Sequence, residues 1–368
     1  DSFLYFTYTQ NSSLDTSSLH GLLKRSNKSP YTIESGRLKD YNTALHLDNR
    51  LTIQYLKSKS LKRKNIKHIS DTVFEIERDE IGTVKKIICS NHIIEGDIFI
   101  DCTGYKRIFS SKSDWVSFKD NLPMNSVTTF TRKHQESMVT KADKLKIGWC
   151  WQIPTQERLG CGYVSCDEWG DDVIDEIKLN YSDAEIVKSF KFESGKLRKS
   201  WNHNVVSLGL AYHFLEPLQA TNIHLTLVQI EMLCQKCIRD TKDRTLNSNV
   251  ISYYNKHIDN LIEDFKNFIN IHYSCDSRVK MTDYNNEIID LLKVRGLFHE
   301  DILQGYGSCG IQLWGHTLLG LNHLTKQDCH KFLSEMNSYD EVKKVSNELE
   351  ESFTNTPFLT YKELIDIL

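Results

Sequence analysis

The segment GLAYHFLEPLQATNIHL, residues 209–225, places small residues and a Glu-Pro dipeptide inside an apolar run. Gly209 and Ala211 leave room for another group to approach the backbone closely. Pro217 fixes its own φ angle and favours an extended conformation at Glu216. These residue types predict a strand that ends in an irregular turn.

A helix is expected to begin directly after this turn. Thr221 and Asn222 are good helix-capping types, and an apolar-periodic run follows them from Ile223. The first amides of a helix have no partner inside it, and they favour an anion. The segment therefore predicts either a site for an anionic or electron-rich group or an ordinary strand-to-helix connection, and these residues alone leave both open.

Two further stretches contain residue types that could serve a ligand. DIFIDCTG, residues 97–104, has an apolar run at 98–100, which predicts a strand buried on both faces. Ligands of open α/β sheets bind at the carboxyl ends of such strands. In GWCWQIP, residues 148–154, Trp149 and Trp151 share one face of a predicted strand. Their rings can pack in the core or wall a channel that excludes water.

The elements that position these stretches follow from hydrophobic periodicity and turn signals. Residues 1–42 show little periodicity and predict a loop. The pattern predicts strands over residues 71–78, 82–90, 97–101, 124–133, 145–153, 159–166 and 203–209. It predicts helices over residues 43–64, 171–188, 223–240, 248–271, 285–294, 325–336 and 339–352. One mixed α/β body with a helical C-terminal portion is therefore expected.

Composition narrows the class of protein. The chain has 368 residues, 39% of them hydrophobic, and a net charge of −3, which favours neither nucleic acid nor an anionic membrane. No apolar run approaches the ~20 residues of a membrane span. The basic run at 57–68 is interpreted as a solvated helix face. Ten cysteines are too sparse for a disulfide scaffold, so a reduced, cytoplasmic setting is expected. The pair Cys234 and Cys237 lacks a second ligand pair, and no metal site is predicted.

Together these stretches resemble the flavin-dependent tryptophan halogenase family. The matching motifs, in order, are DIFIDCTGYKRIF (97–109), GWCWQIPTQERLGCGYV (148–164) and NVVSLGLAYHFLEPLQATNIHL (204–225). Residues 44–58 and 267–279 are similar to the corresponding helices, and the resemblance covers most of residues 44–285. It implies an α/β fold of the FAD-dependent monooxygenase type, with a Rossmann-type FAD-binding body, an antiparallel sheet and a helical C-terminal portion. On this basis we predict an FAD-binding body over 1–240 and a helical substrate-side portion over 241–368.

The resemblance also implies roles for residues at matching positions. Those expected against FAD are Gly104, Gly209, Ala211, Phe214, Leu215, Glu216, Pro217, Leu218 and Ile223. The backbone amides of Thr221 and Asn222 would hold a halide ion. The wall between the flavin and the substrate would consist of Trp149, Trp151, Ile153 and Pro154. Tyr273 and Tyr284 are the aromatic residues expected beside the substrate.

The implied activity is halogenation of an electron-rich aromatic compound. Family members use reduced FAD from a separate flavin reductase, O₂ and halide, and the oxidised halogen reaches a lysine beside the substrate through an internal tunnel. Two alternatives remain open, namely a flavin monooxygenase or oxidase without halide use, and a degenerate, non-catalytic flavoprotein. A transient reductase partner and a possible homo-oligomer are also expected.

The sequence departs from the family pattern in three places. The glycine-rich FAD loop and the lysine have no counterpart, so an N-terminally shortened version is expected. Gln219 stands at the position of the family's catalytic glutamate and cannot act as an anionic base. Within residues 272–286 only the two tyrosines keep the family's aromatic pattern, with Ser274 and Asn285 at other positions. A small indole or a carrier- or peptide-bound aromatic is therefore expected rather than free tryptophan, with bromide or iodide used more readily than chloride.

Overall fold

The computed structural model describes residues 19–41, 46–133, 139–156, 158–239, 247–303, 305–325, 344, 347–348 and 351–367. Within these ranges, no helix has both the length and the apolar character that crossing a bilayer requires. The predicted helices over 325–336 and 339–352 fall mostly outside the described residues. The boundary between residues 240 and 241 also falls outside them, so the division into 1–240 and 241–368 stays a prediction.

A parallel pair of strands leads into two of the predicted ligand-binding segments, DIFIDCTG and the turn after residue 208. β6 (Phe99–Asp101) pairs in parallel with β15 (Val205–Ser207), and β14 (Trp201–Asn202) continues the sheet antiparallel to β15. Phe99 and Val205 are buried, but Ile100 is 43% exposed. The prediction of a strand buried on both faces is therefore wrong, because the described residues leave the face that carries Ile100 partly open.

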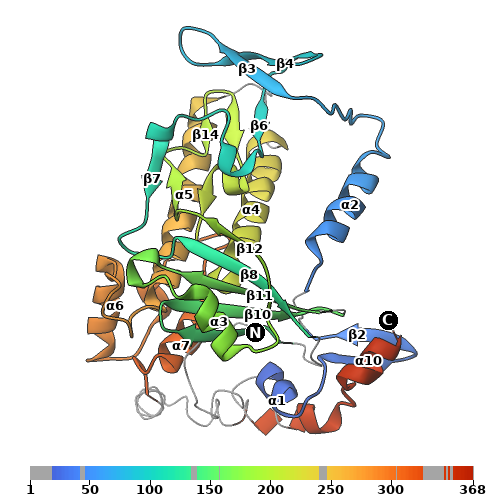
Figure 1. Ribbon diagram of the computed structural model, residues 1–368, viewed down its shortest axis with the longest axis vertical. Coiled ribbons are helices and arrows are strands. Elements are labelled where there is room, and N and C mark those ends of the chain that lie inside the picture. The colour runs from blue at the N-terminus through green and yellow to red at the C-terminus, as the bar shows by residue number, and fades with distance from the viewer. Residues whose placement is uncertain are drawn as a thin grey trace.

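A three-stranded antiparallel meander packs at one end of the molecule (Figure 1). Its strands are β3 (Val73–Arg78), β4 (Val84–Cys89) and β5 (Ile93–Glu95). The buried Asn204 side chain joins the meander to the parallel pair, because it accepts from the Val84 amide at 2.9 Å and donates to the Val84 carbonyl at 2.8 Å.

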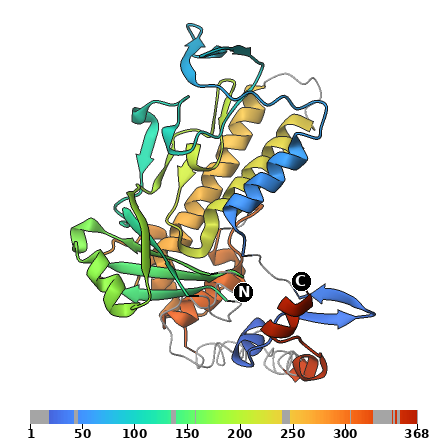
Figure 2. The same cartoon turned by 45° about the vertical axis from the view of Figure 1, so that its right-hand side comes forward.

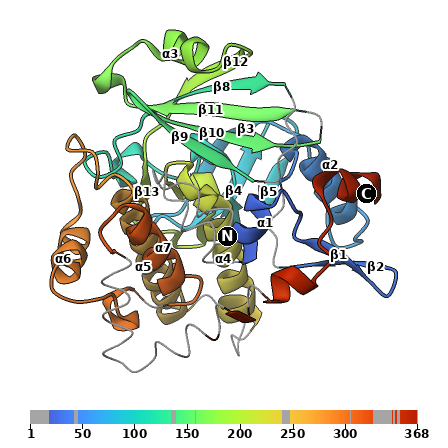
Figure 3. The ribbon, with the colours of Figure 1, turned by 90° about the horizontal axis from the view of Figure 1, so that it is seen from below.

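An antiparallel sheet carries the two tryptophans of the predicted wall. Its strands, in order across the sheet, are β12 (Glu185–Lys191), β8 (Ser126–Arg132), β11 (Leu159–Ser165), β10 (Gly148–Pro154) and β9 (Lys141–Leu145). Helix α3 (Val173–Asn180) covers one face of this sheet, and the long helices lie on the other (Figure 3). The sheet therefore separates the small cluster around Cys150 from the main core around Trp149.

The helix predicted over 171–188 is only partly correct. α3 ends at Asn180, and residues 185–191 form the edge strand β12, in which every residue is exposed. This strand has no apolar face that periodicity could detect. Its pairing with β8 decides its conformation.

Long helices pack against the site from the other side. α4 (Thr221–Glu231) continues into the π-helical segment η8 (Met232–Arg239), and α5 (Ser248–Ile271) confirms the predicted bounds 248–271. Figure 2 shows α4 and α5 side by side. The remaining helices of this part are α6 (Asp283–Leu292), which was predicted over 285–294, and α7 (Ile311–Gly320), which was not predicted.

One side of α4 is left uncovered by the described residues. Ile223 is 65% exposed, Leu227 59% and Ile230 40%, and their spacing puts them on one stripe of the helix. Helix α2 (Asn49–Ser60), predicted within 43–64, likewise contributes no buried residue.

The segments near the two ends of the chain pack together (Figure 1). Their elements are α1 (Leu19–Arg25), β1 (Tyr31–Glu34), β2 (Arg37–Asp40) and α10 (Tyr361–Ile367). The Ser29 amide donates to the Leu359 carbonyl at 2.6 Å, and the Tyr41 and Phe358 rings are in edge contact. The loop predicted over residues 1–42 is therefore wrong for the residues from 19 onward.

Candidate functional site

Two glycine turns meet at the carboxyl ends of the parallel strands. The short helical turn η3 (Gly104–Lys106) follows β6, η6 (Gly209–Ala211) follows β15, and the two turns lie against each other. Gly104 has φ +65° and Gly209 has φ +54°, values that side-chain-bearing residues rarely adopt. A Cβ atom on Gly104 would meet no atom within 4 Å, so space is open beside this backbone.

A buried carboxylate lies beneath the first of these turns. Asp101 is fully buried, and its Oδ1 accepts from the Thr103 amide at 2.9 Å and from the Thr103 hydroxyl at 2.6 Å. Its Oδ2 has no hydrogen-bond partner among the described residues. Open backbone and paired glycine turns let a nucleotide-type cofactor such as FAD approach closely, and the unused carboxylate oxygen of Asp101 fits a hydroxyl of its sugar part.

The segment from Phe214 to Asn222 is an irregular turn closed by one side chain. Asn222 accepts from the Leu215 amide at 3.1 Å and donates to the Leu215 carbonyl at 2.8 Å. Gln219 and Ala220 are consecutive left-handed residues, with φ of 63° and 50°. We call residues 214–222 the reactive turn. Of the predicted cofactor residues, Ala211, Phe214, Leu215, Glu216 and Leu218 are buried, Gly104, Gly209 and Pro217 are half-buried, and Ile223 is exposed.

Helix α4 begins at Thr221, but not with the predicted cap. The residue before the helix is Ala220, and no side chain caps the first turn. Thr221 and Asn222 were predicted to cap it, which is wrong because the Asn222 amide is engaged with Leu215. The Thr221 hydroxyl is buried and has no partner among the described residues. A buried unused hydroxyl beside uncapped helix amides is a donor set that fits a small anion.

The two tryptophans of β10 lie on one face of the antiparallel sheet, as predicted. Trp149 is 3% exposed, Trp151 is half-buried, and their ring centroids are 6.0 Å apart. Trp151 lies directly across Gly162 of β11, where a Cβ atom would come within 2.1 Å of the ring. Ile153 shares this face, whereas Pro154 lies on the opposite one. The alternation therefore brings three of the four predicted wall residues together.

Two buried polar side chains of the reactive turn point back into the protein. Glu216 is fully buried, and it accepts from the Met124 amide at 3.2 Å and from the Tyr273 hydroxyl. Burial raises the pKa of Glu216 to about 8. Gln219, the predicted catalytic position, is 6% exposed, and its Nε2 lies 2.8 Å from Nε2 of His272.

The residues predicted beside the substrate lie on the α5–α6 side of the molecule. Tyr273 is buried, and its hydroxyl also accepts from the Trp149 indole at 3.1 Å. Tyr284 is half-buried in edge contact with Trp314, and its hydroxyl donates to the Asp301 carbonyl at 2.9 Å. Asn285 is fully buried and bonds α5, so it is not available to a substrate in this structure.

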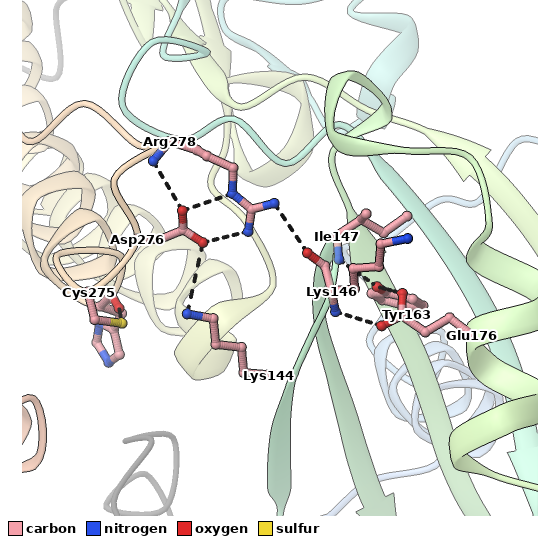
Figure 4. Close-up of polar contacts among 9 residues, drawn as sticks. Lys144, Lys146, Ile147, Tyr163, Glu176, Cys275, Asp276 and Arg278 are labelled. Carbon is pink, nitrogen blue, oxygen red and sulfur yellow. Dashed lines mark hydrogen bonds and ion pairs between the residues drawn. The ribbon is translucent and has the colours of Figure 1, made fainter.

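A charged cluster fixes the segment that follows α5 to the antiparallel sheet (Figure 4). The Arg278 guanidinium donates two bonds to Asp276 and one to the Lys146 carbonyl, and the Arg278 amide donates a further bond to Asp276. The Lys144 ammonium lies 4.0 Å from the same carboxylate. Arg278 also stacks on the Trp169 ring at 3.8 Å. The bonds from Arg278 lower the pKa of Asp276. This cluster holds the end of α5 at a fixed place beside β9.

Solved structures of known proteins share the fold of this chain. The solved tryptophan 6-halogenase from Streptomyces toxytricini superposes with a TM-score of 0.81 at 21% identity, over 95% of this chain and 76% of that one. A tryptophan halogenase from Shewanella frigidimarina superposes with a TM-score of 0.83 at 20% identity, over 97% and 73%. The fold is therefore that of the flavin-dependent halogenases.

The sequence comparison is more specific. The family model described as tryptophan halogenase matches residues 5–288, and the chain belongs to this family. Among curated relatives, it is 27% identical over 268 residues to a tryptophan 6-halogenase of Streptomyces albogriseolus and 25% identical over 266 residues to a tryptophan 7-halogenase of Lentzea aerocolonigenes. The match covers 68% of this chain in both cases, and the chain spans 49% of the length of each relative.

Proposed function

We propose that the protein halogenates an electron-rich aromatic compound with the use of reduced FAD, O₂ and halide. The observation that carries this proposal is the reactive turn, which joins an uncapped helix N-terminus with the unused Thr221 hydroxyl to the tryptophan strand through Glu216 and Tyr273. Reduced FAD, when bound, would supply the two electrons that activate O₂, and O₂ would supply the oxidising equivalents that convert halide into an electrophilic halogen.

The residues of this chain would divide the remaining tasks. Gly104 and Gly209 would let the cofactor approach the backbone, and Thr221 with the first amides of α4 would hold the halide. Trp149 and Trp151 would keep water and the substrate away from the oxidising centre. Gln219 would offer hydrogen bonds but no negative charge.

The proposed substrate is an indole or a carrier- or peptide-bound aromatic rather than free tryptophan. Tyr273 is buried and Asn285 bonds α5, so residues 272–286 offer few exposed rings to clasp a free amino acid. A solved relative of the same fold is a lanthipeptide tryptophan 5-halogenase. We further propose a separate flavin reductase as a transient partner, and bromide or iodide in preference to chloride.

The test is a turnover assay with FAD, a flavin reductase and each halide in turn. Free tryptophan, simple indoles and a tryptophan-containing peptide are compared by mass spectrometry of the products. Halogenated indole or peptide in excess over halogenated tryptophan is expected. Product that contains oxygen in place of halogen, at a rate independent of halide, would instead identify a flavin monooxygenase.

The halide site has a matched pair of variants. Thr221→Val removes only the unused hydroxyl, and the KM for halide should rise about 10- to 100-fold because a bond to a charged group is lost. Thr128→Val removes a buried hydroxyl of β8 that bonds Ser189 of β12, and it should leave the halide KM unchanged. Equal halide KM values in the two variants would contradict this site.

A further inference from the structure

Two consecutive residues at the end of α5 form hydrogen bonds with buried side chains of the reactive turn. The first is His272, whose Nδ1 lies 2.7 Å from the Phe268 carbonyl. A carbonyl only accepts, so Nδ1 carries the proton and Nε2 is left as the acceptor. The Gln219 amide therefore donates to Nε2 over 2.8 Å. Burial lowers the pKa of His272 to about 4, which keeps the ring neutral in this role.

The second residue is Tyr273, whose hydroxyl joins the turn to the tryptophan strand. It donates to Glu216 and accepts from the Trp149 indole at 3.1 Å. Glu216 is fully buried, Trp149 is 3% exposed and Tyr273 is 4% exposed. Bonds between such groups have no competition from water, and the loss of one partner leaves the others unsatisfied.

The turn needs such support because its backbone is unfavourable. Gln219 and Ala220 both adopt the left-handed conformation although neither is glycine. The Asn222 amide closes the turn on one side. Two buried polar side chains of the turn are linked to the end of α5, because Gln219 bonds His272 and Glu216 bonds Tyr273. Tyr273 extends this link to Trp149 of β10.

We propose that His272 and Tyr273 are positioning residues that lock the reactive turn and Trp149 into one unit. The role rests on the proposed function, since it would keep the N-terminus of α4, where the halide is proposed to bind, at a fixed position relative to Trp149 and Trp151 during turnover. In this arrangement Tyr273 acts through Glu216 and Trp149 and does not itself contact the substrate.

The first test compares two tyrosine variants. Tyr273→Phe removes the shared hydroxyl and keeps the ring. Tyr181→Phe, in the small cluster around Cys150, removes a hydroxyl that bonds Asp143. The coupling is measured as halogenated product formed per NADH that the flavin reductase consumes. It should fall about 10- to 100-fold in Tyr273→Phe, because a small displacement of the tryptophan wall uncouples halide oxidation from halogen transfer to the substrate. It should not change in Tyr181→Phe. Equal coupling in both variants would overturn the proposal.

The second test needs no turnover and so separates this proposal from the proposed function. Unfolding free energies are measured for Trp149→Phe, Tyr273→Phe and the double variant. If the indole and the hydroxyl act as one unit, the double variant should be clearly less destabilised than the sum of the single variants. Additive losses would overturn the unit even if the wild type halogenates. A wild type that yields no halogenated product, together with a non-additive cycle, would refute the function alone.

Discussion

Replacement of Gly162 by alanine should displace Trp151, one of the two tryptophans of the predicted wall. Gly162 lies on β11 opposite Trp151, and a Cβ atom there would stand 2.1, 2.2 and 2.6 Å from three carbons of the indole. Carbon atoms in van der Waals contact are about 3.5–4.0 Å apart, so the ring must retreat by roughly 1.5 Å. Gly160, two residues earlier on the same face, offers a matched control, because its nearest neighbour would be the Ile153 carbonyl at 3.7 Å.

The expected difference in stability follows from these distances. Overpacking costs about 1–3 kcal/mol, while alanine gains roughly 0.5–1 kcal/mol over glycine from the smaller backbone entropy of the unfolded chain. Neither glycine has a positive φ, so both alanines fit the strand conformation. Gly162→Ala should therefore lose about 1–2 kcal/mol, whereas Gly160→Ala should be unchanged or slightly stabilised.

Urea unfolding of both variants, with tryptophan emission as the probe, measures this difference. Gly162→Ala should also shift the native emission spectrum, since Trp151 moves relative to Trp149, and it should lower the product formed per NADH consumed. Two variants of equal stability with the same native spectrum would refute the assigned contact between Gly162 and Trp151.

Three further effects are expected. Asn222→Ala removes both bonds that close the reactive turn and should cost about 1–3 kcal/mol of unfolding free energy in urea titrations. Asn204→Ala breaks the bridge to Val84 and should speed amide hydrogen exchange in the meander but not in α5; uniform exchange would contradict the bridge. Burial raises the pKa of Glu216 to about 8 and of Asp264 to about 7, so both take up a proton on folding. The stability that each protonated carboxyl contributes is complete below about pH 4 and is lost by about 1.4 kcal/mol per pH unit as the pH rises toward 7 for Asp264 and toward 8 for Glu216. Glu216→Gln should remove the Glu216 part of this dependence.

The sequence predicts best where the signal is local. The apolar spacing within 248–271 recovers α5 because one face of that helix packs along the core. Alternation in GWCWQIP correctly places Trp149 and Trp151 on one face of β10. Both patterns depend only on residues close together in the chain.

Contacts between distant residues account for what was missed. The exposed edge strand β12 is held by its pairing with β8, and no periodicity marks it. The amide of Asn222 is a good cap by type, yet Leu215, seven residues earlier, engages it instead. The role of His272 beside Gln219 joins residues 53 positions apart, and its only sequence signal is a histidine at the end of a predicted helix.

The uncovered stripe on α4 has a practical consequence for handling the protein. Ile223, Leu227 and Ile230 present adjacent aliphatic side chains to the solvent, and contiguous apolar surface of this kind promotes association. Sulfate and phosphate strengthen apolar contacts by exclusion from protein surfaces. The chain should therefore be retained on a phenyl-substituted chromatography matrix in ammonium sulfate and elute late. Buffers of low salting-out strength should keep it dispersed at the concentrations that spectroscopy and crystallisation require.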